Sequence, residues 1–233
     1  MENQFSKINP VRGRAPRGAR STRLLARAAS NGIKLIIGLG NPEPEYDNTY
    51  HNAGKLMVDY LLKKLVSGGV SKAACFHKKT SGNFESCTVC DFRLVKPTNY
   101  MNENGKAAKA ALKSFGTKAD SLLVAHDDSD IEIGTYKTSF GSGSAGHNGV
   151  QSVIENMGTK NFWRLRIGIR PSPRNSALSQ RRSALRPKAD LPAEVRRTKA
   201  GEFVLKKITD ADDKLMCSAF EKAFEELFGK KAI

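Results

Sequence analysis

Hydrophobic residues recur along the chain at two spacings, one typical of strands and one typical of helices. Short apolar or alternating runs predict strands at residues 33–37, 84–90, 92–95, 121–125 and 163–169. Apolar stripes at helical spacing predict helices at residues 55–65, 102–115, 150–157 and 209–228. Residues 131–139 are predicted as a partly exposed strand. Strands that alternate with helices predict an α/β domain of three layers, in which helices cover both faces of a mixed, twisted sheet.

Length and charge suggest one domain with basic additions. A chain of 233 residues can bury one substantial core, which we place within residues 31–229. The net charge of +16 favours a polyanionic partner. Residues 1–30 hold seven Lys or Arg and one acid, and residues 171–200 hold eight and two, so twelve of the sixteen excess charges lie there. Residues 172–200 are poor in apolar side chains, which predicts a disordered insertion.

The first thirty residues have the composition of an organellar presequence, because they are rich in Arg, Ser and Ala and contain only Glu2 as an acid. We therefore expect a mitochondrial protein. The alternative is a cytoplasmic protein with a basic arm that touches RNA. N-terminal sequencing of the mature protein distinguishes the two.

Cysteine and hydropathy patterns exclude several classes. Four cysteines in a chain of this length are too few for a disulfide framework. Cys87 and Cys90 form a lone CxxC inside a predicted strand, with no second ligand pair nearby, so we predict no metal there. No apolar run approaches the roughly 20 residues of a membrane span, so we predict no membrane association.

Polar residues that could carry chemistry lie just beyond predicted strand ends, where α/β sheets usually bind ligands. His51 follows the turn GLGNP, and Asp127 follows the strand at 121–125. A carboxylate that accepts from one ring nitrogen of a histidine leaves the other nitrogen free to take a proton. Asn41, Asn102 and Asn148 could orient water or stabilise an oxyanion, although such asparagines often serve only as caps or turn residues.

Three other patterns do not match the functional motifs that they resemble. GLGNPEPEY begins like a dinucleotide fingerprint, but a proline and a glutamate follow where the third glycine belongs. The acidic run 127–130 resembles a calcium loop, but Ile133 stands in place of the turn glycine. Ser142 and Ser144 lie in a Gly/Ser loop rather than on a sharp strand-to-helix turn, so we do not expect a nucleophile. We predict no cofactor.

Five motifs occur in the order GLGNPEPEYDNTYHNAG, KPTNYMNENG, LLVAHDDSDIEIG, GSAGHNGVQSVI and NFWRLRIGI. In this order and at these separations they resemble the bacterial-type peptidyl-tRNA hydrolase family, over about residues 33–169 and again from near Glu202. The resemblance implies hydrolysis of the ester between a peptide and tRNA. It implies that His51 accepts a proton, that Asp127 stabilises the basic form of that histidine, and that Asn41 distinguishes N-blocked from free aminoacyl-tRNA.

The resemblance also implies contacts to the substrate. Tyr46, Tyr100, Asn102 and Asn148 match positions that contact the tRNA 3′ end or the peptide, and Asn102 would also help Asn41 to orient water or the oxyanion. Exposed cations are candidate phosphate contacts, and a solvated helix face is the alternative interpretation for the first three of them: Lys106, Lys109, Lys113, Lys137 and Arg166. We expect peptidyl-tRNA as the partner of a monomer, with no obligate protein partner.

Two departures from the family pattern concern substrate binding. Tyr50 stands where the family usually has Arg, and Ser142–Ala145 replaces a glycine-rich run. Both changes could alter how tightly the acceptor stem or the peptide is held. A non-catalytic RNA-binding protein on the same scaffold remains an alternative. A metal-dependent nuclease that uses Asp127, Asp128 and Asp130 is a third possibility.

Overall fold

A seven-stranded mixed sheet forms the centre of the computed structural model, which describes residues 32–69, 75–89, 91–171 and 203–229. The strands are β1 (Leu35–Gly38), β2 (His77–Lys79), β3 (Phe84–Val89), β4 (Phe92–Pro97), β5 (Leu122–Glu132), β6 (Tyr136–Phe140) and β7 (Trp163–Arg170). Their order in the sheet is β2-β3-β4-β1-β5-β7-β6. Strands β4, β1, β5 and β7 run parallel, whereas the pairs β2–β3, β3–β4 and β6–β7 are antiparallel.

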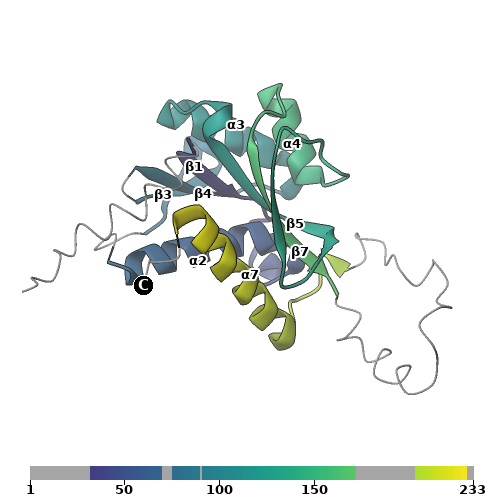
Figure 1. Ribbon diagram of the computed structural model, residues 1–233. Coiled ribbons are helices and arrows are strands. Elements are labelled where there is room, and N and C mark those ends of the chain that lie inside the picture. Colours follow the sequence, from purple (N-terminus) through teal and green to yellow (C-terminus); the bar gives the residue numbers. More distant parts are fainter. Residues whose placement is uncertain (1–31, 70–74, 90, 172–202, 230–233) are drawn as a thin grey trace, which may run out of the picture.

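Helices cover both faces of this sheet, as the sequence predicts (Figure 1). Helices α2 (Ala53–Ser67) and α7 (Asp210–Phe228) pack on one face, and α3 (Asn104–Phe115) and α4 (Asn148–Met157) pack on the other. Short 3-10 turns connect them: η1 (Pro44–Tyr46), η2 (Tyr50–Asn52), η3 (Thr80–Gly82), η4 (Met101–Glu103) and η5 (Ala119–Ser121). None of the helices in the described ranges is long and apolar enough to cross a membrane.

Two segments differ from the sequence-based expectation. The strand predicted at 121–125 continues to Glu132, so Asp127 lies in β5, opposite Ile167 of β7, rather than in a loop. The apolar run ends before the strand does, because residues 126–130 of β5 are polar while the backbone of the strand still pairs with β7. Residues 131–139 are not one strand, because a turn with Gly134 at a φ of +83° separates β5 from β6. The sequence pattern also misses β2, whose three residues are all exposed and show no alternation.

Close backbone packing brings His51 to the end of β5. A Cβ on Gly38 would lie 2.2 Å from the carbonyl oxygen of Gly54, and a Cβ on Gly54 would lie 2.3 Å from that of Ala125. The start of α2 therefore lies directly against β1 and β5. Since His51 precedes Gly54 by three residues and Asp127 follows Ala125 by two, this contact places both side chains in one region.

Residues 203–208, which we call the C-terminal strap, cross the turn that carries His51. The His51 amide donates to the carbonyl oxygen of Val204 at 2.8 Å, and the Ile208 amide donates to that of Asn48 at 2.7 Å. Thr49 and Lys207 form an isolated antiparallel bridge. The helix that follows, α7, is capped by Thr209, whose hydroxyl accepts from the Asp212 amide. The expectations for residues 1–30, for 172–200 and for Cys90 lie outside the described residues.

Candidate active site

The predicted histidine and aspartate meet at the end of β5. His51 Nδ1 lies 3.0 Å from Oδ1 and 3.1 Å from Oδ2 of Asp127. Asp127 is buried, whereas His51 is half-buried. Because the carboxylate occupies Nδ1, the other ring nitrogen, Nε2, is left without a hydrogen bond to any described side chain. This is the arrangement that a general base requires.

A second histidine, His147, shares the same carboxylate. Its Nε2 lies 2.9 Å from Asp127 Oδ1, and its Nδ1 accepts from the backbone amides of Gly149 and Val150 at 3.1 and 3.2 Å. An Nδ1 that accepts two N–H groups carries no proton, so the proton lies on Nε2 and is donated to Asp127. His147 therefore acts as a hydrogen-bond donor to Asp127.

The two histidines keep Asp127 ionised. Burial by itself raises the pKa of this carboxyl, but the attraction and hydrogen bonds of His147 and then of His51 outweigh burial and hold its pKa below the ordinary value. An ionised carboxylate in contact with His51 stabilises the imidazolium that forms when His51 takes a proton. The pair thus has the electrostatics as well as the geometry of a base and its partner.

Asn41 is fixed by a network that joins three turns. Its Oδ1 accepts from the Met101 amide at 2.8 Å, and its backbone amide donates to Oδ1 of Asn52 at 2.8 Å. Its backbone carbonyl accepts from Lys55 Nζ, also at 2.8 Å. Asn104 supports the same turn, because its Oδ1 accepts from the Gly40 amide at 2.9 Å. With Oδ1 engaged, the amide N–H₂ group of Asn41 is the part of the side chain available to a ligand.

His126 lies behind the site and is kept neutral. Its ring packs edge-on against His147 with centroids 4.8 Å apart, and its Nδ1 lies 2.7 Å from the carbonyl oxygen of Asp127. Burial, followed by the neighbouring His147, lowers the pKa of His126 from 6.5 to about 3. The ring is 2% exposed, and its Nε2 has no partner among the described residues. Protonation of His126 would therefore disrupt the packing under His147.

This burial predicts an acid-sensitive contribution to stability. A histidine whose pKa is depressed on folding stabilises the fold above pH 6.5, and that stabilisation is lost as the pH falls from 6.5 toward 3. His126→Phe keeps a ring without the titration. Between pH 6.5 and 4 the parent should lose stability relative to the variant by on the order of 1 kcal/mol per pH unit, as measured by urea unfolding. His77→Phe, at an exposed position, is the control. Parallel pH dependences of the parent and His126→Phe would contradict the prediction.

Comparison with known proteins agrees with this geometry. The family model described as peptidyl-tRNA hydrolase matches residues 35–183, which is more than half of the chain. The chain belongs to the peptidyl-tRNA hydrolase family. A peptidyl-tRNA hydrolase of Methylobacillus flagellatus is 37% identical over 150 residues, covering 64% of this chain and 76% of the relative. One of Lawsonia intracellularis is 42% identical over 142 residues, covering 60% and 68%.

Solved structures of the family confirm the fold. The crystal structure of peptidyl-tRNA hydrolase from Acinetobacter baumannii is similar with a TM-score of 0.65 and 28% identity, and the match covers 85% of this chain and 89% of that one. A peptidyl-tRNA hydrolase in complex with N-propanol is similar with the same TM-score and identity, covering 86% and 90%. The predicted three-layer α/β fold and the resemblance stated from the motifs are both confirmed.

The other residues suggested by the family resemblance lie on nearby turns at the surface. Tyr46 belongs to η1 and is half-buried, and Tyr100, which is 49% exposed, directly precedes η4. Asn102 in η4 and Asn148, the first residue of α4, are both exposed. Asn102 makes no side-chain hydrogen bond to another described residue. Hydrogen bonds to Glu45 and Glu43 raise the pKa of the Tyr46 and Tyr100 hydroxyls, respectively. None of these side chains forms a hydrogen bond with His51 within the described residues.

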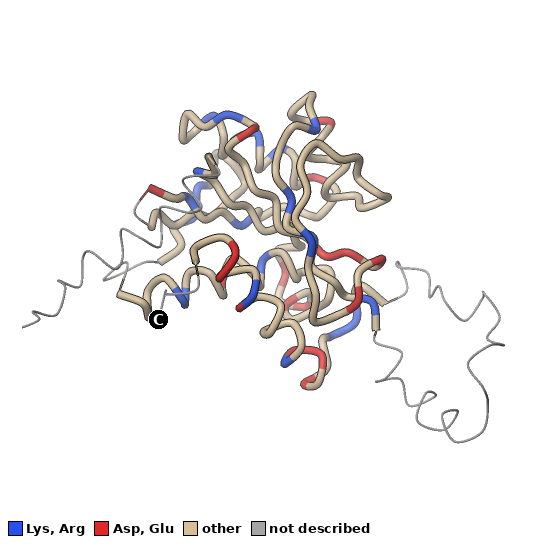
Figure 2. Tube along the Cα trace, in the orientation of Figure 1, with Lys and Arg blue, Asp and Glu red and all other residues tan. Residues whose placement is uncertain are grey.

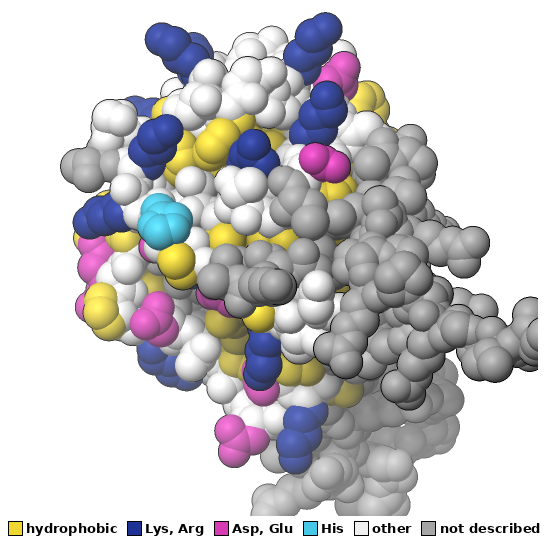
Figure 3. Space-filling view, turned by 90° about the vertical axis from the view of Figure 1, so that its left-hand side faces the viewer, with side chains coloured by type: hydrophobic (Ala, Val, Ile, Leu, Met, Phe, Trp, Pro, Cys, Tyr) yellow, Lys and Arg dark blue, Asp and Glu magenta, His cyan; other side chains and the backbone are white. Residues whose placement is uncertain are grey.

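The predicted phosphate contacts are spread out and partly engaged. Lys106 pairs with Glu103 at 2.5 Å, and Arg166 Nε pairs with Asp128 Oδ2 at 2.7 Å. Figure 2 shows the cations on α3 and β7 and the acids along the second half of β5. On the face shown in Figure 3, the Lys and Arg side chains stand apart, with uncharged atoms between them. The described residues on that face therefore form no continuous basic patch.

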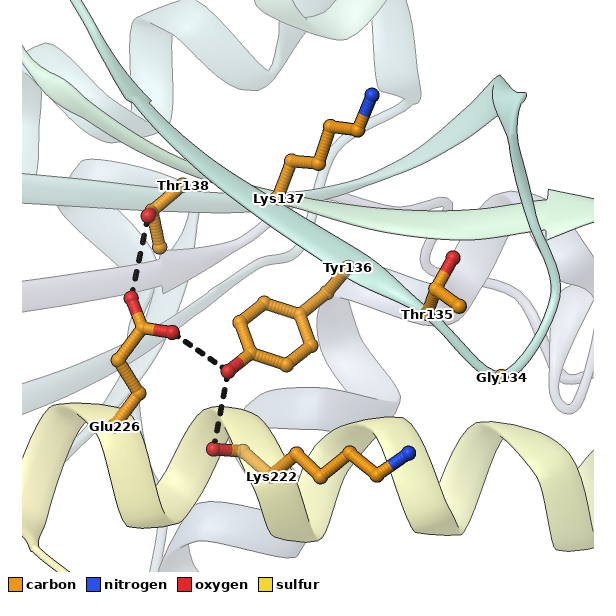
Figure 4. A pocket seen from close by; sticks show the side chains of 7 residues that line it. All are labelled: Gly134, Thr135, Tyr136, Lys137, Thr138, Lys222 and Glu226. Carbon is orange, nitrogen blue, oxygen red and sulfur yellow. Dashed lines mark hydrogen bonds between the residues drawn. The ribbon is translucent and has the colours of Figure 1, made fainter.

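A shallow hollow of about 440 Å³ lies between β6 and α7, away from the histidines. Tyr136 crosses it and donates to Oε2 of Glu226 at 2.6 Å, and Thr138 contacts Oε1 of the same carboxylate (Figure 4). Lys137 points to the opposite side of β6 from Tyr136. Because Lys137 is paired in register with Arg166, these two cations lie on the other face of the sheet, toward α4. The hollow itself contains neither His51 nor Asp127.

One group of side chains has the spacing of a metal site: His51, Asp127 and His147. Within the described ranges they form a group whose ligand atoms lie within 4.8 Å of one another. The donor set does not fit, because His147 would have to bind through Nε2, which carries its proton as long as Nδ1 accepts from two amides. Moving that proton to Nδ1 would break the cap of α4.

Tyr50, one of the two departures from the family pattern, faces the core rather than the site. Its ring is 7% exposed and packs edge-on against Phe203, with centroids 5.9 Å apart. Its hydroxyl donates to Oδ2 of Asp212 at 2.5 Å, and burial followed by this bond raises the pKa of Tyr50 to about 12. The side chain joins α7 and the C-terminal strap to the turn of His51, and its burial leaves little of its surface for a substrate to contact.

Loss of the Tyr50 hydroxyl should therefore affect stability more than substrate binding. Tyr50→Phe keeps the contact with Phe203 and removes the bond to Asp212. The free energy of unfolding should fall by about 1–2 kcal/mol, because a hydrogen bond to a charged group is lost, while KM should stay near the parent value. Denaturant unfolding and steady-state kinetics measure the two. A large rise in KM at unchanged stability would place Tyr50 in the binding surface instead.

Sequence reasoning missed His147, Asn52 and Asn104. His147 lies in the motif GSAGHNGVQSVI, directly before the predicted Asn148. The available signal was a polar side chain immediately before a predicted helix, the position whose side chain accepts from the first backbone amides. Asn52 and Asn104 act through backbone groups of residues distant in sequence, and no local pattern identifies such partners.

Proposed function

We propose that this chain hydrolyses the ester between a peptide and the ribose of the 3′-terminal adenosine of tRNA, with His51 as general base. Water attacks the ester carbonyl while His51 Nε2 takes its proton. The tetrahedral intermediate then expels the ribose oxygen, which recovers that proton from the imidazolium. Asp127 stays ionised throughout and stabilises the transient cation.

Amide groups around this pair supply the remaining polar contacts in the proposal. The free N–H₂ of Asn41, held in place through its Oδ1, and the exposed Asn102 would donate to the developing oxyanion or orient the water. Asn148 would bond the peptide backbone, which is common to all peptides. Substrate choice would then be independent of the peptide sequence.

Neutral amides also account for selection of blocked substrates. A free α-ammonium next to Asn41 would be desolvated, and Asp127 could not pair with it without giving up its bonds to His51 and His147. An N-acetylated or peptidyl amine carries no such charge. Tyr46 and Tyr100 would contact the tRNA 3′ end or the peptide, and Lys137 and Arg166 would face phosphates.

The observation that carries the proposal is the contact between His51 and Asp127, which leaves the other nitrogen of His51 without a bond to any described side chain. The test is hydrolysis of N-acetyl-aminoacyl-tRNA against the same tRNA with a free amine. We expect turnover of the blocked substrate and little of the free one. Absence of turnover in the parent would favour the non-catalytic RNA-binding alternative.

The nuclease alternative makes an opposite prediction for chelators. It requires Asp127, Asp128 and Asp130 to hold a metal, but Asp127 is bonded to two histidines and Asp128 to Arg166. Treatment with EDTA should therefore leave ester hydrolysis unchanged. Loss of activity with EDTA and its return with a divalent cation would support the metal mechanism.

Monomeric state and mitochondrial location also belong to the proposal. The composition of residues 1–30 supports import, with a cytoplasmic protein as the alternative. N-terminal sequencing of protein from purified mitochondria tests import, and an intact Met1 would argue against it. Sedimentation of the purified protein tests the oligomeric state.

A further inference from the structure

The segment 141–147, which carries His147 into the site, has few anchors of its own; we call it the His147 loop. None of residues 141–146 is buried, and Gly141, Ala145 and Gly146 have positive φ angles. At its start, the Gly141 amide donates to the carbonyl oxygen of Phe162 at a long 3.4 Å. The Ser144–His147 bond lies within the loop itself. Packing therefore does not hold the middle of this loop in place.

One short bond ties the middle of the His147 loop to the sheet. Arg164 Nη1 donates to the carbonyl oxygen of Gly143 at 2.6 Å. Arg164 lies on β7, paired with Val124 of the central strand β5 and with Ser139 of β6. The donor therefore stands on a rigid element, while the acceptor stands on a segment with little support.

Arg164 is also unusual as a buried cation. The residue is 2% exposed, and among the described residues it forms no ion pair with a carboxylate, because Arg166 occupies Asp128. Burial, followed by the charge of Arg166, lowers the pKa of its guanidinium. Burying an unpaired charge opposes folding, so an apolar residue here would serve stability better unless the position has another use.

We propose that Arg164 is a positioning residue for the catalytic pair, acting through Gly143 and the His147 loop. The inference rests on the proposed function of His51. By holding Gly143, Arg164 fixes the course of the backbone that leads to His147. The Nε2 atom of His147 contacts the same Oδ1 atom of Asp127 as His51 does. When the loop is released, His147 leaves the carboxylate, and the undivided charge of Asp127 faces His51. Asn148, next to His147, loses its fixed position at the same time.

The test compares Arg164→Gln and Arg164→Lys with the parent on N-acetyl-aminoacyl-tRNA. Gln is too short to reach Gly143 in the same way, whereas Lys retains a cationic donor. For Arg164→Gln, kcat should fall by roughly ten-fold, because a misplacement of about 1 Å near a reacting group can cost on the order of 10²-fold. The rising limb of kcat against pH should move to higher pH, because Asp127 then stabilises the protonated form of His51 more strongly. Arg164→Lys should have a kcat and a rising limb close to those of the parent.

The pH readout separates positioning from mere folding. Within the described ranges, the titratable side chains in contact with His51 are Asp127 and His147, and the hydrogen bond from the C-terminal strap comes from the backbone carbonyl of Val204. A loss of folded protein lowers kcat at every pH without moving the limb. An unmoved limb in Arg164→Gln, with Arg164→Lys equally impaired, would overturn the proposal. His77→Ala, at an exposed position on β2, is the control expected to match the parent.

A second measurement needs no activity. Hydrogen exchange of peptides spanning 141–147 should be faster in Arg164→Gln than in the parent, with β5 and β7 unchanged. Gly143→Ala offers a rescue, because a Cβ there meets no atom within 4 Å and alanine restricts the free loop. In the Arg164→Gln background it should slow this exchange again. Unchanged exchange in Arg164→Gln would overturn the positioning role, whether or not the parent is active on tRNA. Inactivity of the parent on tRNA would overturn the proposed function instead.

Discussion

His51→Ala should reduce kcat on N-acetyl-aminoacyl-tRNA by roughly 10²–10⁴-fold, the range by which a positioned general base accelerates such reactions. The substitution removes the nitrogen that takes the proton of water and leaves Asp127 with His147 as its remaining donor. KM should change little, since the proposed contacts to tRNA and peptide come from other residues. Single-turnover hydrolysis with radiolabelled substrate measures the rate of the chemical step directly.

The chain supplies its own control for this variant. His77 is an exposed histidine on β2, at the sheet edge that lies farthest from β7, and His77→Ala should match the parent. Far-UV circular dichroism should be unchanged in both. Equal activities of His51→Ala and the parent would remove the proposed mechanism, while binding of tRNA retained without any turnover in the parent would support the RNA-binding alternative.

The layout of the domain follows from local patterns. Apolar runs mark the strands that lie in the middle of the sheet, because both faces of those strands are buried. Helical stripes mark α2, α3 and α7 because each buries only one face. The same reasoning fails for β2, which is an exposed edge strand, and for the far end of β5, where polar site residues interrupt the apolar run while the backbone ladder continues.

The sequence predicts only those site residues that follow the end of a predicted strand. His51 and Asp127 are separated by 76 positions, and parallel pairing of β1 with β5 brings them to the same edge of the sheet. The shared use of Asp127 by His147 is not predictable in this way, because it depends on the path of a loop. The role of Arg164 is still less visible, since a basic residue in an alternating strand usually indicates an exposed face.

Asp127→Asn should test whether the carboxylate acts through its charge. Asparagine is similar in size and can still accept from His51 and His147 through one oxygen, so the arrangement of the rings should largely persist. The negative charge that stabilises the imidazolium is lost. We therefore expect kcat to fall by roughly 10²–10⁴-fold, comparable to removal of the base, because a base that cannot hold its proton is ineffective in the transition state.

The pH dependence of Asp127→Asn separates charge from geometry. Without the carboxylate, protonated His51 is less stable, so the rising limb of kcat against pH should move to lower pH, opposite to the shift expected for Arg164→Gln. Asp130→Asn, at an exposed position of the same strand, should match the parent. If both aspartate variants lost activity and manganese restored it, the metal mechanism would apply. If Asp127→Asn kept full activity with an unmoved limb, Asp127 would only support the fold, and His51 would have to act without it.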